Sequence, residues 1–153
     1  MIVSDSTTLI ILFDLKRLDL LSKLFSKIII PNAVYNEISH KKPIKLPDFI
    51  TVKTPHECEI LETLKTILDN GESEAIALAL QMKSGLIIDE KKGRKIAISQ
   101  GIEIIGLLGI IYLNITKGFI TKAQAKEFLE NAIHHGYRIN QNLIDSMFSQ
   151  IND

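Results

Sequence analysis

The chain has little cysteine, no net charge and no long hydrophobic run. Cys58 is its single cysteine, so no disulfide forms within the 153 residues. Together with the lack of a secretory signal, this indicates a reducing, cytoplasmic setting. Eighteen basic residues balance eighteen acidic ones, which excludes an overall positive field that would draw the chain to nucleic acid or to a membrane surface. The apolar stretches fall well short of the roughly 20 residues that span a bilayer, so we expect no membrane association.

Aliphatic residues, by contrast, are abundant. Hydrophobic residues make up 46% of the chain and aromatic residues 6%, so the core is expected to consist mainly of Ile and Leu. A chain of this length can bury roughly two-thirds of the surface that its unfolded form exposes. We therefore predict a single globular domain over residues 1–153.

Short apolar runs alternate with segments of helical spacing in the first two-thirds of the chain. The expected strands are residues 2–4, 27–30, 49–53, 85–89 and 102–105, and the expected helices begin near residues 6, 19, 31, 60, 72 and 90. We expect Asn70 and Gly71 to end the helix that begins near residue 60, and Gly85 to end the next one. This alternation indicates an α/β fold with a mostly parallel sheet.

The last third of the chain has no strand-like stretch. Its segments of helical spacing are residues 107–117, 122–134 and 140–151. Thr121 and Gln124 have capping-box spacing at the start of the middle segment, and Gly136 is placed to end it. The last two helices are amphipathic, so we expect them to cover the sheet or a partner. The predicted organisation is an α/β core at 1–106 and a helical extension at 107–153.

An aspartate directly follows two of the expected strands. Asp5 comes after the first strand and Asp89 after the apolar run that begins at Gly85, and a helical segment follows each aspartate. In an open parallel sheet, ligands bind at the carboxyl ends of the strands, so both side chains are expected at one edge. The alternative is that each aspartate only caps the helix that follows it.

Three glutamates are expected near the same edge. Glu37 lies two helical turns after the strand at 27–30, and Glu72 and Glu74 open the helix that precedes Asp89. On a regular helix, residues two positions apart differ by roughly 200 degrees, so both reach one site only where the first turn is irregular. The alternatives are a solvated helix position for Glu37 and simple interaction with the helix dipole for Glu72 and Glu74.

Converging carboxylates have a chemical consequence. Without lysine or arginine between them they repel one another and lose hydration, which is costly unless a cation neutralises them. Oxygen ligands favour a hard divalent ion, Mg²⁺ or Mn²⁺, over zinc, and such an ion activates water for phosphodiester hydrolysis. The predicted catalytic residues are Asp5, Glu37, Glu72, Glu74 and Asp89. Of these, Asp5, Glu37, Glu74 and Asp89 are the predicted metal ligands.

A basic cluster follows Asp89 directly. Lys91, Lys92 and Arg94 lie at an expected helix N-terminus, which already favours phosphate. We predict that they bind the substrate backbone; the alternative is a solvated, charged helix face. No aromatic residue is interleaved with these charges, so base stacking is not indicated.

Four stretches of the chain resemble the four acidic motifs of the PIN-domain superfamily. They are VSDSTTLI, IIPNAVYNEI, GESEAIALAL and LIIDEKKGRKIA, and together they span nearly the full length. The resemblance, especially to a branch related to VapC-type toxins, implies a three-layer α/β/α domain with a parallel sheet of order 3-2-1-4-5 and a magnesium-dependent ribonuclease site. By motif, Asp5, Glu37 and Asp89 match the family's acids, and Ser6 takes the hydroxyl position after the first, which we predict to bind substrate.

The third motif departs from the family pattern, because it has glutamates where many PIN toxins have an aspartate. In this respect it is similar to the paired glutamates of flap endonucleases. The functional hypothesis is an endoribonuclease that acts as the toxin of a toxin–antitoxin pair, with RNA as substrate, an antitoxin protein as partner and a homodimer as the assembly. The first alternative is a non-catalytic PIN-like module that binds RNA or a protein. The second, a phosphatase of the haloacid dehalogenase type or a receiver domain, fits the aspartate positions poorly.

Overall fold

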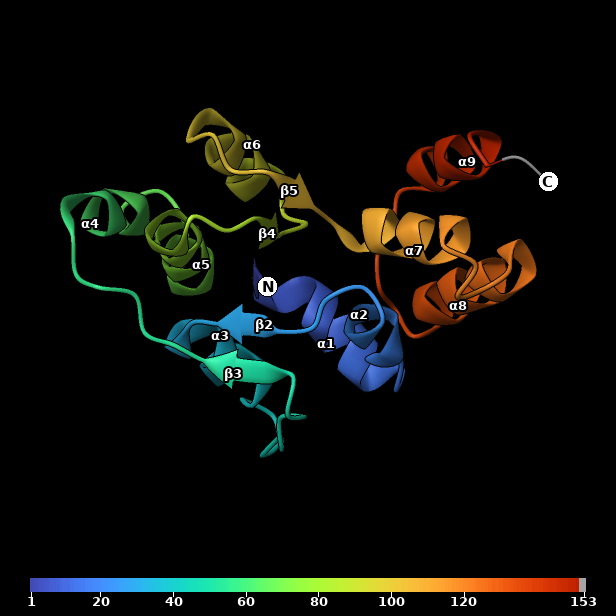
Figure 1. Cartoon of the computed structure of the whole chain (residues 1–153), viewed down its shortest axis with the longest axis horizontal. Helices are drawn as coiled ribbons and strands as arrows, with labels where there is room; N and C mark the ends of the chain where they lie inside the picture. Colours follow the sequence, from blue (N-terminus) through green and yellow to red (C-terminus); the bar gives the residue numbers. More distant parts are fainter. Residues whose placement is uncertain (152–153) are drawn as a thin grey trace.

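A parallel sheet forms the centre of the computed structural model, which describes residues 1–151; the last two residues of the expected extension lie outside them. The strands are β1 (Ile2–Ser4), β2 (Ile28–Ile30), β3 (Ile50–Val52), β4 (Leu86–Ile87) and β5 (Ile104–Ile105). All neighbours pair in parallel, in the order β3-β2-β1-β4-β5 (Figure 1). The predicted α/β class and strand order are confirmed.

Helices cover both faces of this sheet. The helices are α1 (Ser6–Asp14), α2 (Asp19–Ser22), α3 (Asn32–Ile38), α4 (Glu59–Lys65), α5 (Asn70–Met82), α6 (Lys91–Ser99), α7 (Leu107–Thr116), α8 (Lys122–His134) and α9 (Gln141–Ser149). Successive side chains of a strand point to opposite faces, so Ile2 packs in one core cluster and Val3 in the other. The first cluster takes in α1, α2, α3 and α7, and the second takes in α4, α5 and α6. Burial on both faces explains why the strands are continuous apolar runs.

The two glycine stops expected around α5 are wrong. Asn70 and Gly71 do not end a helix; they are the first two residues of α5. The reason is Asp69, whose side chain accepts a hydrogen bond from the backbone N–H of Glu72 and so caps the new helix. At the other end Lys83, with φ 53°, takes the left-handed position that ends the helix, whereas Gly85 leads directly into β4.

The helices after Gly106 gather at one end of the molecule (Figure 1). The predicted capping box is present, because Thr121 and Gln124 each accept a hydrogen bond from the backbone of the other. Buried side chains of α8 and α9, among them Phe128 and Met147, join the same core cluster as α1, α2 and α7. The amphipathic faces therefore pack on the domain's own helices. Within the described residues, no helix is long and apolar enough to cross a membrane.

Candidate functional site

The carboxyl ends of β1 and β4 bring Asp5 and Asp89 to one edge of the sheet. These strands are direct neighbours, and the backbone N–H of Asp5 donates to the carbonyl oxygen of Ile87 at 2.8 Å. Glu37 on α3 and Asp69 before α5 lie near the same edge. Their charges, like that of Asp89, add to the effect of burial in raising the pKa of Asp5. The sheet topology thus collects four carboxylates from four separate parts of the chain.

Asp5 is the most deeply buried of these acids. Its side chain is 4% exposed, and its Oδ1 atom has no hydrogen-bond partner. Asp5 stands at the N-cap position of α1, yet its side chain makes no capping hydrogen bond there. Burial, opposed by the backbone N–H of Ser6, raises the pKa of Asp5 to about 7. A plain helix cap, the alternative for this residue, does not match that geometry.

Glu37 is held toward Asp5 by a hydroxyl group and a glycine. Ser6 Oγ donates a hydrogen bond to Glu37 Oε2 at 2.7 Å. A Cβ atom on Gly71 would lie 2.0 Å from Glu37 Oε1, so only glycine leaves room for this carboxylate at the start of α5. Burial raises the pKa of Glu37, the Ser6 hydrogen bond lowers it, and Asp69 raises it again. Ser6, predicted to bind substrate, here positions an acid.

Asp89 is fixed by the first turns of two helices. Thr8 Oγ1 on α1 donates to Asp89 Oδ2, and the backbone N–H of Leu107 on α7 donates to Asp89 Oδ1 at 3.0 Å. A Cβ atom on Gly106 would lie 2.5 Å from Asp89 Oδ1. Asp89 therefore faces α7 and the side chain of Thr8, and does not cap its own helix α6; Glu90 does that by accepting from the N–H of Gly93.

Glu72 and Glu74 point to different surroundings, as a regular helix requires. Glu72 is 8% exposed, and its Oε2 atom lies where a Cβ atom on Gly93 would be 2.7 Å away. Burial first, and then the carboxylates of Asp69 and Glu90, raise the pKa of Glu72 to about 9. A pKa this high favours the protonated form at neutral pH, and the buried Oε2 atom of Glu72 has no hydrogen-bond partner among the described residues.

Glu74 has a structural partner instead. Its Oε1 atom accepts a hydrogen bond of 3.2 Å from the backbone N–H of Ala33, in the first turn of α3. A carboxylate at this end of a helix satisfies a free N–H group and interacts favourably with the helix dipole. The contact is with the N-terminus of α3 and not with the helix that Glu74 itself opens, so it links α5 to α3.

The three basic residues after Asp89 have different surroundings. Arg94 Nη1 donates to the carbonyl oxygen of Ile88 at 3.0 Å, so this guanidinium holds the end of β4. Lys91 lines a cavity together with Asp89, whereas Lys92 lies outside the cavity lining. Among residues 1–151 the one salt bridge joins Arg17 to Asp19. No cation forms a direct ion pair with the four acids in the described part of the chain, and Arg94 is the cation beside Asp89, since a Cβ atom on Gly106 would lie 2.6 Å from Arg94 Nη1 and 2.5 Å from Asp89 Oδ1.

The acid cluster suits a hard divalent cation by its chemistry. In residues 1–151 no three His, Cys, Asp or Glu side chains already surround one point closely enough to hold a metal ion. The buried oxygen of Asp5 is nevertheless unpartnered, the acids whose charges act on it are all carboxylates, and Gly71 and Gly106 leave room for the side chains of Glu37 and Asp89, the second beside Arg94 Nη1. Oxygen donors of this kind match Mg²⁺ or Mn²⁺.

Sequence reasoning missed two residues of this cluster. Asp69 stands three positions before Glu72, which is capping spacing, but the Asn-Gly pair between them was interpreted as a helix stop. Thr8 gave no local signal, because its contact with Asp89 joins residues 81 positions apart. The room that Gly71, Gly93 and Gly106 leave for carboxylates likewise gave no local signal.

One family model matches the chain. The model for the PIN domain covers residues 1–153, and the strand order with acids at the carboxyl edge agrees with it. No curated protein and no solved structure matches. The family assignment therefore depends on the family model and on the fold.

Proposed function

We propose a function from one premise: the chain belongs to the PIN-domain family. PIN domains are generally nucleases, and this supports phosphodiester hydrolysis as the class of reaction. The finer proposal is an endoribonuclease that depends on Mg²⁺ or Mn²⁺. Its role as the toxin of a toxin–antitoxin pair, the antitoxin partner and the homodimer remain predictions from the resemblance to VapC-type proteins.

The observation that carries the proposal is the uncompensated charge at the carboxyl edge. Asp5 is buried with an unpartnered oxygen, and Glu37, Asp69 and Asp89 all act on it electrostatically. Burying such groups costs free energy unless they are protonated or bind a cation. Perturbed acids of this kind gather preferentially at functional sites.

The residues of the proposed site have two kinds of role, metal binding and the orientation of the metal ligands. Asp5, Glu37 and Asp89 would hold the ion, with Asp69 beside them. Bound there, a divalent ion supplies Lewis acidity and lowers the pKa of water. Ser6 and Thr8 orient the carboxylates, since each hydroxyl donates to one of them and such supporting contacts fix ligand geometry.

Two of the predicted catalytic glutamates receive other roles in this proposal. Glu72, whose pKa is raised by burial, is a neutral carboxyl group beside Asp69 and Glu90, while Glu74 holds α3 through the backbone N–H of Ala33. Lys91, Lys92 and Arg94 remain predicted contacts to the RNA backbone.

A non-catalytic PIN-like module that binds RNA or a protein is the second candidate function. The favouring observation is that no three ligating side chains already surround a common point in the described residues. Such a module would keep its partner affinity in the presence of a chelator, because no metal takes part in the contact.

One experiment separates the two functions. Purified protein is incubated with a mixed pool of single-stranded RNA in Mg²⁺, in Mn²⁺ or in chelator, beside an Asp5→Asn variant. We expect cleavage that requires the metal and is lost in the variant. A well-folded protein that neither cleaves the pool nor binds metal by calorimetry would refute the ribonuclease and favour the binding module.

A further inference from the structure

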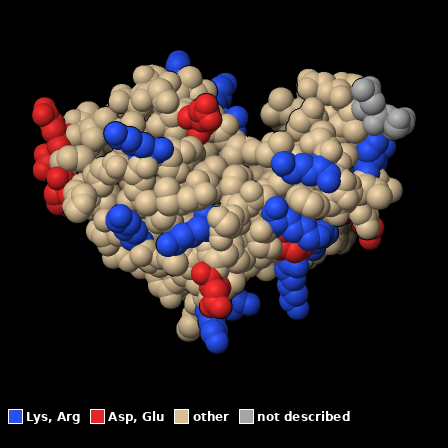
Figure 2. Space-filling model, viewed as in Figure 1, with Lys and Arg blue, Asp and Glu red and all other residues tan. Residues whose placement is uncertain are grey.

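A groove leads away from Asp89 between α6 and α9. Its volume is about 1090 Å³, at the upper end of the roughly 300–1,000 Å³ typical of ligand pockets. Figure 2 shows the hollow as a dip in the outline between these helices. A second cavity, of about 720 Å³, shares Tyr112 and Gln150 with the first. The two cavities therefore adjoin, and together they can hold an extended ligand.

The cationic wall of the groove is one stripe of α6. Lys91, Arg94, Lys95 and Ile98 all line it, and their spacing of three, four and seven residues places them on one helix face. Asp89 is the single acid among the lining residues. Because Arg94 is engaged by β4 and neither lysine is in a salt bridge in the described part of the chain, Lys91 and Lys95 are available to an anionic ligand.

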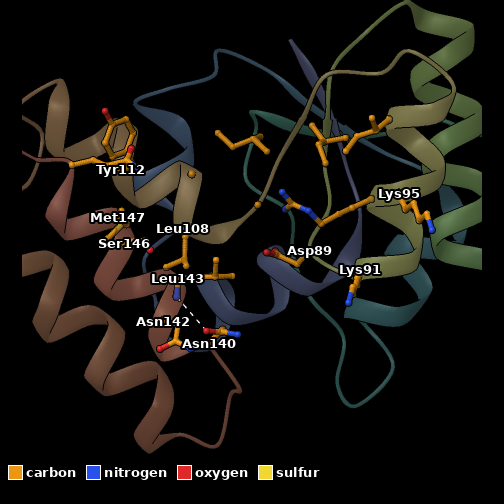
Figure 3. Close-up of a pocket in the computed structure, with 17 residues that line it drawn as sticks. Asp89, Lys91, Lys95, Leu108, Tyr112, Asn140, Asn142, Leu143, Ser146 and Met147 are labelled. Atoms are coloured by element: carbon orange, nitrogen blue, oxygen red, sulfur yellow. Dashed lines mark hydrogen bonds between the residues drawn. The ribbon is translucent and has the colours of Figure 1, made fainter.

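The opposite wall is neutral and partly apolar. Asn142, Leu143, Ser146 and Met147 of α9 face Asp89, Lys91 and Lys95 across the groove (Figure 3). Leu143 is 58% exposed and Ile98, on the other wall, is 60% exposed. A concave surface with an exposed hydrophobic side chain on each wall can contact flat apolar groups of a ligand.

We propose that this groove holds the unpaired bases of a single-stranded RNA next to the phosphate at Asp89, with Lys91 and Lys95 on the backbone and α9 on the bases. The proposal rests on the ribonuclease function above, because it places the substrate of that site. The ligand must offer negative charge to α6 and flat apolar surface to α9. Single-stranded RNA offers both at short intervals, whereas a duplex hides its base faces.

The groove also contains an aromatic residue. Aromatic residues are not interleaved with the basic cluster in the sequence, yet the fold brings Tyr112 of α7 to the same groove as Lys91. Figure 3 places Tyr112 at the far end from the lysines. An RNA strand that runs from Asp89 along the groove would therefore meet charge first and the aromatic ring later.

The test measures binding without catalysis. Fluorescence anisotropy of a short labelled single-stranded RNA is followed in chelator at several salt concentrations. For Lys91→Ala/Lys95→Ala we expect about tenfold weaker binding, and a salt slope smaller by about 0.7 for each lysine. The matched control is Lys27→Ala/Lys65→Ala, two exposed lysines that do not line the groove, and it should keep both affinity and slope.

A second variant tests the base-binding wall. Leu143→Asn should weaken binding about fivefold, the equivalent of about 1 kcal/mol, without changing the salt slope. It should not affect an abasic strand of the same length, which has the phosphates but no bases. Ile133→Asn, at an exposed position of α8, is the matched control and should leave both ligands unaffected.

Three outcomes would overturn the proposal. They are a lysine variant that behaves like its control, a Leu143→Asn effect that is equal for abasic and normal RNA, and a groove that binds poly-glutamate but not RNA, which would assign it to an acidic protein partner. Groove-dependent RNA binding without any cleavage would instead refute the ribonuclease alone. Cleavage unaffected by either groove variant would refute the groove alone.

Discussion

The acidic edge of the sheet and the α6–α9 groove meet at Asp89 but differ in the sign of their charge. At the edge, Asp5, Glu37, Asp69 and Asp89 crowd together with no cation paired to them in the described residues. The groove contains a single acid, three cations and neutral amide side chains. The edge is acidic with no cation ion-paired to it in the described residues, while the groove has cations of its own. Two such surfaces side by side suit a ligand that is itself anionic and is processed by a bound cation.

The difference also appears in how each region is held. Glu37 and Asp89 pack against glycines, because an added Cβ atom on Gly71 or Gly106 would collide with their carboxylates. Hydroxyl groups donate hydrogen bonds to the same two carboxylates. In the groove, Leu143 and Ile98 are simply exposed. Several contacts from different helices thus hold the carboxylates of the edge in place, as expected where energetically unfavourable groups are kept for function.

The largest effect should come from removing charge at the point where the regions meet. Asp89→Asn should lower RNA cleavage by about 100-fold or more, because a bound ion contributes several kcal/mol to the transition state. Glu74→Gln is the matched control: it also removes a carboxylate charge near α5, but its partner is the N–H of Ala33. Cleavage is measured by gel assay of labelled RNA in Mg²⁺.

Equal losses of cleavage in Asp89→Asn and Glu74→Gln would contradict the roles assigned to these residues, since they would place Glu74 in the site as well. Full activity of Asp89→Asn would remove Asp89 from the mechanism. Circular dichroism of both proteins checks that the fold is intact, which matters because Asp89 also holds the first turn of α7 through Leu107.

A smaller effect should follow from filling the space beside Glu37. In Gly71→Ala the new methyl group would lie 2.0 Å from Glu37 Oε1, so the carboxylate has to move. We expect a loss of about 10- to 100-fold in cleavage, the range seen when supports of metal ligands are changed. Helix propensity alone would favour alanine, so instability of α5 does not explain such a loss. Asn70→Ala, one residue earlier and exposed, is the control; unchanged activity of Gly71→Ala would contradict the proposed role of Glu37.

Much of the fold follows from local patterns. The run at 27–30 followed by Pro31 gave β2 and α3, and the Thr121–Gln124 spacing gave the start of α8. The error at Asn70 and Gly71 has a clear cause: this pair is common both where helices stop and where turns precede a helix. Only the side-chain contact from Asp69 decides between them.

The sequence predicted those parts of the candidate site that depend on where strands end. It did not predict the parts that depend on packing between distant segments. Asp5 and Asp89 were placed correctly at one edge, because parallel strands end at the same edge. Helix geometry indicated that Glu72 and Glu74 face different ways, although both were predicted to be catalytic. Thr8 and the space beside the glycines depend on contacts between distant segments, which no local pattern reports.

Metal binding should stabilise the edge but not the groove. At a concentration of Mg²⁺ or Mn²⁺ about 100 times its dissociation constant, the free energy of unfolding should rise by about 2.7 kcal/mol, or roughly 5–10 °C in Tm for a chain of this size. Asp5→Asn should lose this response, and Leu143→Asn should retain it. Differential scanning fluorimetry with and without chelator measures both; an unchanged Tm for the wild-type protein in saturating metal would contradict a metal site at the edge.

The smallest effect concerns protonation of Glu72 in chelator. Its pKa is near 4.3 in an unfolded chain and about 9 in the folded protein, so between these values the native state binds more protons than the unfolded state. The free energy of unfolding therefore falls as pH rises through this window. Glu72→Gln should match the wild-type Tm near pH 4, where the carboxyl group is neutral in both states, and should exceed it increasingly from there to about pH 9, because glutamine has no ionised form that favours the unfolded chain; the difference in Tm is about 2–4 °C for each kcal/mol. Thermal melts across this range decide the matter: a variant that follows the wild-type curve at every pH would mean that Glu72 is already ionised, and the edge would then carry still more charge for a cation to neutralise.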